Sequence, residues 1–246
     1  MAEFDSLRAA VTANNLLKVE EILGDLDQQF KDKPNRNEYL NQRKALCFEA
    51  LNRKNLPLLK LVFHGEIFIM GREFDRDANI EMLNAAIAGD YAEGVQFLNE
   101  QRLSLEYEER GWSALQEATS KNKTAVIKFL FSLPYLNINL NPEETLLMTA
   151  CSRRHVEILN LLLSNNRIKE TINVTSSKDG GTALHRCFEG AIQPDDASVL
   201  ACVKALVQAG ADVNLPAKST NKTPYALANE KGQKQAAQYL KDNGAN

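Results

Sequence analysis

The chain has 246 residues, of which 44% are hydrophobic and 25% are charged, enough apolar side chain for a buried core and enough charge for a soluble surface. Its net charge of −3 argues against a dominant nucleic-acid role, because phosphate binding usually needs a concentrated basic surface. No signal-like start and no apolar stretch of about 18 residues is present. We therefore expect a cytoplasmic protein without membrane insertion, folded as one continuous domain over residues 1–246.

Three pairs of apolar segments occupy the first 106 residues. They lie at 7–10 and 15–23, at 45–50 and 58–62, and at 83–86 and 95–98. Two stretches between them, Asp25 to Gln42 and Gly65 to Asn79, look like connections longer than a regular repeat needs. Long loops on a rigid scaffold often carry binding functions, although added loop length also costs little stability.

Four similar starts follow in the second half, spaced 32, 37 and 41 residues apart, near a repeat unit of about 33 residues. They are Ser113, Thr145, Thr182 and Thr223. A leucine lies 17 residues after three of them, as Leu130, Leu162 and Leu240. Residues that stop helices and tolerate a left-handed backbone follow the second apolar runs; these are Asn166, Gly210 and Gly244.

Each start has the chemistry of a helix N-terminus. A Ser or Thr side chain accepts a backbone N–H as an N-cap, and Pro224 suits a first helical turn, where its missing donor costs nothing. A polar turn and a second apolar run follow, such as Val156 to Leu163. The pattern predicts two short antiparallel helices in each unit.

These segments resemble the ankyrin-repeat family. Its T-P-L-H-x-A start is similar to TLLMTA at Thr145, TALH at Thr182 and TPYALA at Thr223, and GADVN at 210–214 and HVEILNLLL at 155–163 are also similar to family segments. The three segment pairs of the first half look like more divergent units. The resemblance implies an all-α fold, an ankyrin-repeat solenoid of stacked antiparallel helix pairs with short hairpin turns. The approximate repeats are 3–30, 43–68, 80–106, 110–140, 142–173, 179–215 and 220–246.

One cluster of residues is compatible with chemistry. Cys151 and His155 lie four residues apart in one unit, and His185 and Cys187 lie in the next, so a metal-dependent or thiol enzyme is an alternative. The resemblance implies framework roles instead, with His185 at the family's TPLH histidine and the cysteines at small buried positions, where a free thiol behaves as a small hydrophobe. We expect reduced cysteines, no cofactor and no enzymatic activity.

The resemblance implies that a protein partner binds the concave face made by the first helices and the hairpin turns. Tryptophan and arginine dominate many binding surfaces, so Arg110 and the only tryptophan, Trp112, are candidates, although Trp112 could instead pack locally. Cations at the ends of first helices suggest a basic stripe for an acidic segment of the partner, or merely a solvated face. The full set is Arg53, Lys54, Arg110, Trp112, Lys121, Glu144, Arg153, Arg154 and Lys222.

Three roles fit such a surface. We expect a monomeric adaptor, or an effector that bacteria deliver to the cytoplasm of a host cell, while a regulatory subunit that inhibits an enzyme is an alternative. If Trp112 is not the centre of the site, the stretches 25–42 and 190–197 are the next candidates. The second of these lengthens the turn inside the sixth unit.

Overall fold

A computed structural model of the chain describes residues 2–31, 36–63, 74–106, 113–138, 141, 143–190, 193 and 195–246. The regular elements in these ranges are helices, and one isolated bridge joins Glu106 to Ser113. The predicted all-α class and the solenoid of helix pairs are therefore confirmed. No helix in the described ranges has the length and apolar content needed to cross a membrane.

The chain divides into two compact units, residues 1–105 and 106–246. Each has its own stack of helices, and each is described by itself below. The predicted continuity of the seven repeats as one domain is not tested by this division and stays a prediction.

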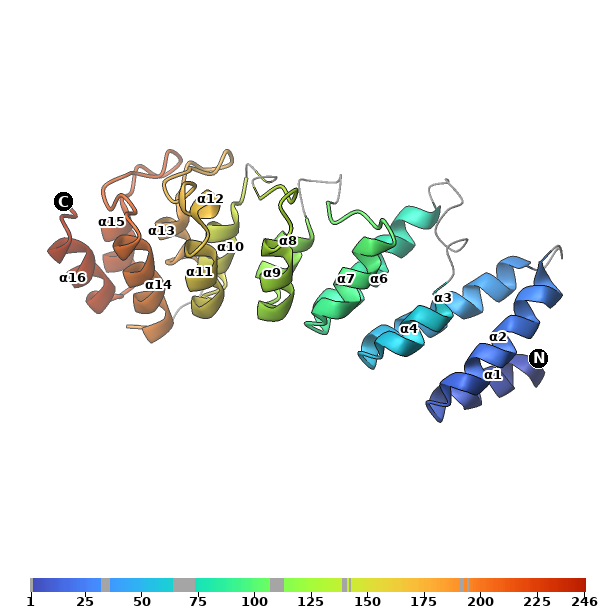
Figure 1. The fold of residues 1–246 in the computed structure, drawn as a ribbon. Coiled ribbons are helices and arrows are strands. Elements are labelled where there is room, and N and C mark those ends of the chain that lie inside the picture. Colours follow the sequence, from blue (N-terminus) through green and yellow to red (C-terminus); the bar gives the residue numbers. More distant parts are fainter. Residues whose placement is uncertain are drawn as a thin grey trace. The chain divides into compact units, whose positions relative to one another are not determined.

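The first unit contains three helix pairs (Figure 1). In each pair the two helices pack against each other, and α2 also packs on α4 and α3 on α6. The helices are α1 (Ala2–Thr12) with α2 (Leu16–Phe30), α3 (Arg36–Asn52) with α4 (Leu56–Val62), and α6 (Phe74–Ala88) with α7 (Ala92–Glu100). The sequence interpretation of Asp25 to Gln42 as a long connection was wrong, because most of it extends α2 and α3. Residues 74–79 likewise belong to α6.

A buried arginine joins α2, α3 and α4. Arg43 on α3 is 3% exposed, and its Nη1 lies 2.8 Å from both carboxylate oxygens of Asp27 on α2. Its other nitrogens donate to the carbonyl oxygens of Leu61 and Val62 at the end of α4. Since the last carbonyls of a helix lack partners within the helix, Arg43 ends α4 and ties it to α2. Tyr39, near the start of α3, also donates to Asp27 at 2.5 Å, so residues near the start of α3 and the end of α2 take part in the same cluster.

The second unit stacks four helix pairs in two rows (Figure 1). The first helices α8, α10, α13 and α15 pack in sequence on one another, and α11, α14 and α16 do the same among the second helices. The pairs are α8 (Ala114–Ser120) with α9 (Thr124–Phe131), α10 (Leu146–Ser152) with α11 (Val156–Leu163), α13 (Ala183–Arg186) with α14 (Ala197–Gln208), and α15 (Pro224–Glu230) with α16 (Lys234–Asp242).

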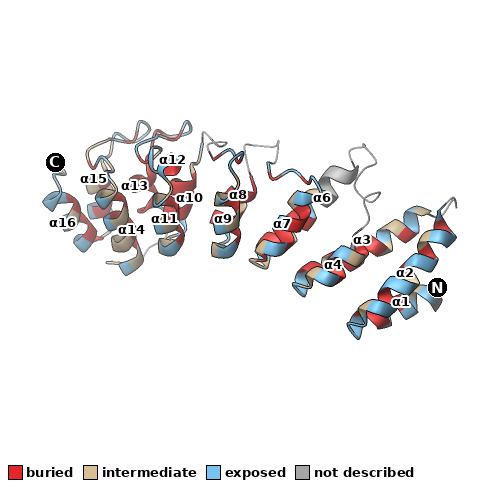
Figure 2. Cartoon of the chain, viewed as in Figure 1, coloured by how far each residue is buried: buried red, intermediate tan, exposed pale blue. Residues whose placement is uncertain are grey.

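The predicted core leucines lie where the register places them. Leu130, Leu162 and Leu240 are all 0% exposed, each on the second helix of its pair. Figure 2 shows that the buried residues of these helices gather on the sides that face neighbouring helices, while the outward sides are exposed. Burial of this apolar stripe against the next pair is the main stabilising contribution in a stacked repeat.

Every described pair shares one backbone feature. A residue with a left-handed backbone lies two positions before the second helix. In six pairs the N–H of the following residue bonds to the carbonyl of an alanine five positions earlier, at 2.8 to 3.0 Å, which is the bond of a Schellman helix end. The left-handed residues are Asn14, Lys54, Asp90, Asn122, Arg154, Asp195 and Gly232, and the alanines are Ala10, Ala50, Ala86, Ala118, Ala150 and Ala228.

Two of the three predicted helix stops are confirmed. Gly210 and Gly244 have φ angles of +101° and +92° and follow α14 and α16. The prediction for Asn166 was wrong, because this residue begins a further short helix, α12 (Asn166–Lys169), with Asn165 as its N-cap. The N-cap role of the neighbouring Asn165 lets a helix begin at this point, and the residue type of Asn166 alone did not reveal that start.

Candidate functional site

The four repeat starts of the second unit are helix caps. The hydroxyl of Ser113 accepts the N–H of Gln116 at 3.2 Å, and those of Thr145 and Thr223 each accept an N–H three residues on at 3.3 Å. Such a cap satisfies a backbone donor that the helix itself cannot. The caps fix where each first helix begins, and therefore where the preceding hairpin turn ends.

His185 caps its own helix and also reaches the next repeat. Its Nδ1 lies 3.0 Å from the backbone nitrogen of Thr182 and accepts that N–H. Its Nε2 lies 3.1 Å from the carbonyl oxygen of Lys222, and a carbonyl can only accept, so Nε2 carries the proton. Burial lowers the pKa of His185 from its ordinary 6.5, which keeps the ring in this neutral tautomer.

Gln116 on α8 also links two consecutive repeats, in a first helix that carries no histidine. Its Nε2 donates to the carbonyl oxygen of Glu144 at 3.2 Å and to the hydroxyl of Thr149 at 2.6 Å. Gln116 and Thr149 are both buried. The N-terminal ends of the first helices are thus joined from one repeat to the next through side chains.

Two adjacent hairpins, residues 176–181 and 217–222, are locked together. The N–H of Ser219 donates to the carbonyl oxygen of Asp179 at 2.9 Å. Gly180 has a φ of +73°, which favours glycine, and a Cβ there would lie 2.8 Å from the backbone nitrogen of Lys218. Both the backbone conformation and the lack of space therefore require glycine at this position. The hydroxyl of Ser176 donates to the carbonyl oxygen of Glu143 at 2.6 Å, which connects the hairpin before them.

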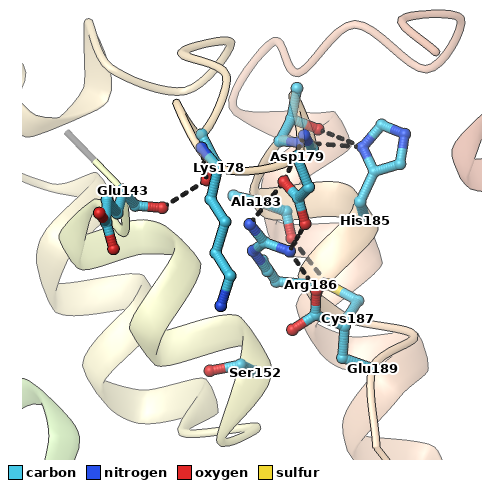
Figure 3. Close-up of polar contacts among 12 residues, drawn as sticks. Glu143, Ser152, Lys178, Asp179, Ala183, His185, Arg186, Cys187 and Glu189 are labelled. Atoms are coloured by element: carbon cyan, nitrogen blue, oxygen red, sulfur yellow. Dashed lines mark hydrogen bonds and ion pairs between the residues drawn. The ribbon is translucent and has the colours of Figure 1, made fainter. Parts of the chain in front are cut away.

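Arg186 pairs with two acids, Asp179 in the 176–181 hairpin and Glu189 after α13 (Figure 3). Its guanidinium forms a two-pronged pair with Asp179, with nitrogen to oxygen distances of 2.7 and 2.9 Å, and it also bonds to Glu189. The hydrogen bond from Arg186, with further help from the N–H of Gly181, lowers the pKa of Asp179 to about 2. Both carboxylates therefore have an ion-pair partner within the protein, and the three groups together keep one negative charge.

The predicted basic stripe is only partly free to bind. Lys121 pairs with Glu117 on its own helix at 2.8 Å, and Arg53 pairs with Glu49 at 2.6 Å and donates to the carbonyl oxygen of Val11. Arg153 is exposed and makes no ion pair within the described residues.

The other predicted site residues that the structure describes take part in turns, ion pairs or bonds between repeats. Lys54 and Arg154 are the left-handed residues of their turns, and Arg154 donates to the carbonyl oxygen of Glu189. The ammonium of Lys222 lies 2.5 Å from Glu230, and the Glu144 carbonyl serves the framework through Gln116. Arg110 and Trp112 lie outside the described residues, so their roles stay predictions. Of the predicted basic stripe, Arg53 and Lys54 belong to the first unit, whereas Lys121, Arg153 and Arg154 belong to the second.

Comparison with known proteins agrees with this framework. Residues 179–218 match the family model of the ankyrin repeat. These residues form an ankyrin repeat, and the rest of the chain shares the fold of ankyrin-repeat solenoids. Its fold is similar to the crystal structure of the ankyrin repeat domain of Bcl-3, a member of the IkappaB protein family, with a TM-score of 0.65 and 22% identity over 82% of this chain and 86% of that one.

A bacterial structure is similar to almost the same extent. The ankyrin repeat domain from Acinetobacter baumannii AYE has a TM-score of 0.61 and 21% identity over 81% of this chain and 98% of its own. At these identities the likeness shows the shared fold. None of the curated protein sequences compared matches the chain.

The cysteine and histidine cluster occupies framework positions of the ankyrin repeats. Cys151 and Cys187 are fully buried free thiols, as is Cys202 on α14. Burial, and then hydrogen bonds with Cys187 and Cys202, raises the pKa of Cys151 well above 9.0. His155 faces the carbonyl oxygen of Ser120 at 3.1 Å. Within the described ranges, no group of three or more His, Cys, Asp or Glu side chains could hold a metal ion.

The long turn inside the sixth repeat is anchored to the seventh. Gln233, just before α16, accepts the N–H of Asp196 at 2.9 Å and donates to the carbonyl oxygen of Gln193. Asp195 accepts the N–H of Gln235 at 2.8 Å. The sequence correctly placed an extension between 190 and 197, and its polar groups near α14 and α16 are occupied by the neighbouring repeat.

Proposed function

We propose that this ankyrin-repeat protein is a non-enzymatic interaction module, an adaptor or effector in the cytoplasm, that binds a protein partner on the face formed by the first helices and the hairpin turns. Ankyrin repeats are generally protein-protein interaction modules. The same surface would serve a regulatory subunit that blocks an enzyme. A fold specifies the shape of a surface and not its target, so the proposal depends on what the surface offers.

One observation supports the proposal most directly. The backbone groups and buried polar side chains at the hairpins and first helices bond from repeat to repeat, through Ser176, Gln116 and His185. A surface held in this way loses little conformational entropy when a partner binds, which favours affinity. The exposed side chains on it, such as Arg153, remain open for contact.

A thiol or metal enzyme is supported less well. A nucleophile needs a base within hydrogen-bond reach and access for a substrate. Both ring nitrogens of His185 already have partners in the repeat framework, and the thiols of Cys151 and Cys187 are fully buried. These residues are better explained as packing and capping groups.

The test compares partner capture by matched variants. Immobilised wild type, Trp112→Ala and Arg153→Glu would each be exposed to the same cell lysate, beside the double variant Lys128→Glu/Lys234→Glu, which changes charge on exposed second-helix positions. We expect a partner that the first two variants lose and the control retains. Equal capture by all four proteins would contradict the proposed face.

Two further measurements sharpen this test. Trp112 is the only tryptophan, so a partner that binds beside it should change the emission spectrum of the protein on titration. Because Lys121 is already paired with Glu117, Lys121→Glu should weaken binding less than Arg153→Glu does. A larger effect at Lys121 would contradict this ranking of the two cations.

A further inference from the structure

Three hairpins that connect consecutive repeats of the second unit lie side by side. One carries an exposed acidic side chain, and the other two each carry an exposed lysine. They are residues 141–144, 176–181 and 217–222, joined in this order by the Ser176 to Glu143 and Ser219 to Asp179 bonds. Glu143 on the first is exposed, as are Lys178 on the second and Lys218 on the third. None of these three side chains forms an ion pair within the described residues.

The nearby charges of opposite sign are occupied elsewhere. Asp179 and Glu189 are held by Arg186, and Glu230 is held by Lys222. In Figure 3 the Lys178 side chain is directed away from the carboxylate of Asp179. The two lysines therefore offer their charge to an outside group, and the close approach of Gly180 to Lys218 fixes the spacing between their hairpins.

The neighbouring hydroxyl and amide groups suit the same kind of ligand. Ser177, Ser219, Thr220 and Asn221 are exposed on the two lysine-bearing hairpins, and such groups donate hydrogen bonds to carboxylates. Glu143 at the adjoining hairpin would repel a long polyanion such as a nucleic acid. The surface thus favours a partner whose charge changes sign along its length.

The repeat spacing sets the pattern of that partner. Packed helices lie about 8–10 Å apart, and an extended chain advances about 3.3 Å per residue, so successive hairpins face residues about three positions apart. Resting on the proposed function, we propose that these hairpins bind an extended acidic segment of a protein partner, with acidic side chains over Lys218 and Lys178 and a basic side chain over Glu143.

Synthetic peptides test this inference directly. Two fluorescent peptides with Gly and Ser spacers would carry Glu-x-x-Glu-x-x-Lys in either chain direction, and a control of the same composition would carry Glu-x-x-Lys-x-x-Glu. We expect one of the two matched peptides to bind about tenfold more tightly than the control peptide in fluorescence anisotropy. Equal binding of all three would overturn the inference.

Variants of the protein test whether the peptide binds at these hairpins or responds only to the net charge of the protein. Lys178→Glu/Lys218→Glu should weaken the matched peptide about tenfold or more, while Lys128→Glu/Lys234→Glu makes the same charge change elsewhere and should not. Circular dichroism would verify that both variants are folded. Equal weakening by both, or tighter binding of a 12-nucleotide single-stranded DNA than of the matched peptide, would overturn the inference.

The outcome can be distinguished from failure of the proposed function. If the peptides do not discriminate and a captured partner is still lost with Arg153→Glu, the interaction module stands and the hairpin inference is wrong. If no variant of the face changes partner capture, the proposed function itself is wrong.

Discussion

His185 joins two consecutive repeats by donating from Nε2 to the carbonyl oxygen of Lys222, 3.1 Å away. The opposite ring nitrogen accepts the N–H of Thr182 at 3.0 Å. One side chain thus satisfies a donor in its own hairpin and an acceptor in the next. The stability of the second unit should depend on this ring and on similar links between its repeats.

Replacement of His185 by alanine should destabilise the protein. The buried N–H of Thr182 would lose its acceptor, and an unsatisfied buried polar group costs about 1–3 kcal/mol. The free energy of unfolding in urea measures the change. His155→Ala is the control, because His155 is only half-buried and faces the single carbonyl of Ser120. A loss at His155 equal to that at His185 would contradict the proposed role of the ring.

Gly180→Ala should cost more stability than Gly190→Ala. Both glycines have a φ of +73°, so each substitution carries the same left-handed penalty of about 1 kcal/mol. Only at Gly180 does the new methyl group meet the backbone of Lys218, whereas nothing lies within 4 Å of a Cβ at Gly190. The added clash should cost about a further 1–3 kcal/mol, measured by urea unfolding. Equal losses would show that the hairpins can separate freely.

Stability should fall in two steps as the solution is acidified. Burial lowers the pKa of His185 below 6.5, so the unfolded chain takes up this proton first and stability falls as the pH drops below 6.5. Hydrogen bonding to Arg186 lowers the pKa of Asp179 from 3.8 to about 2, so its contribution is present above pH 3.8 and is lost as the pH falls to about 2.

Two variants assign these steps. His185→Gln should remove the step below pH 6.5 from the curve of unfolding free energy against pH, and Asp179→Asn should remove the step below pH 3.8. A wild-type curve that either variant leaves unchanged in its own window would contradict that assignment.

Arg43→Met should destabilise the first unit more than Arg53→Met. The Arg43 side chain is 4% exposed and bonds to Asp27 and to two carbonyls at the end of α4. Asp27 is 39% exposed and can be solvated without Arg43, so the cost comes mainly from the carbonyls that lose their donor, about 1–3 kcal/mol. The Arg53 side chain is 39% exposed, pairs with Glu49 on its own helix and donates to the carbonyl oxygen of Val11. Water can replace Arg53 at both groups, so its removal should cost less, about 0.5–1 kcal/mol. Thermal unfolding of the two variants measures the difference, and similar losses would contradict the role of Arg43.

The sequence correctly predicted the helix pairs of the second unit and their first residues. Capping is a local property, so Ser113, Thr145, Thr182 and Thr223 could be identified without knowledge of the tertiary structure. The same holds for the buried leucines, because the repeat register places them on the packed side of each second helix. The first unit was predicted less well, since α2 and α3 extend around Arg43, whose partners lie 16 to 19 residues away in the chain.

The left-handed turns show what residue type cannot reveal. The residue two positions before each second helix is Asn, Lys, Asp, Arg or Gly. No single residue type therefore identifies this position in the sequence. The part shared by six of the seven pairs is a bond to a buried alanine carbonyl five residues from its donor, and that alanine could have been found as a recurring small residue. The backbone conformation follows from the close approach of the two helices and not from the side chain.

The sequence by itself determined the repeat, its caps, its core and the kind of surface that such a stack presents. Only the tertiary structure decided which charges on that surface are free. Lys121 and Lys222 are paired within their own repeats, and Asp179 is held by Arg186, whereas Lys178 and Lys218 remain open. Charge pairing depends on distances of a few ångströms between side chains, and those distances are set by how hairpins and helices pack rather than by their spacing along the chain.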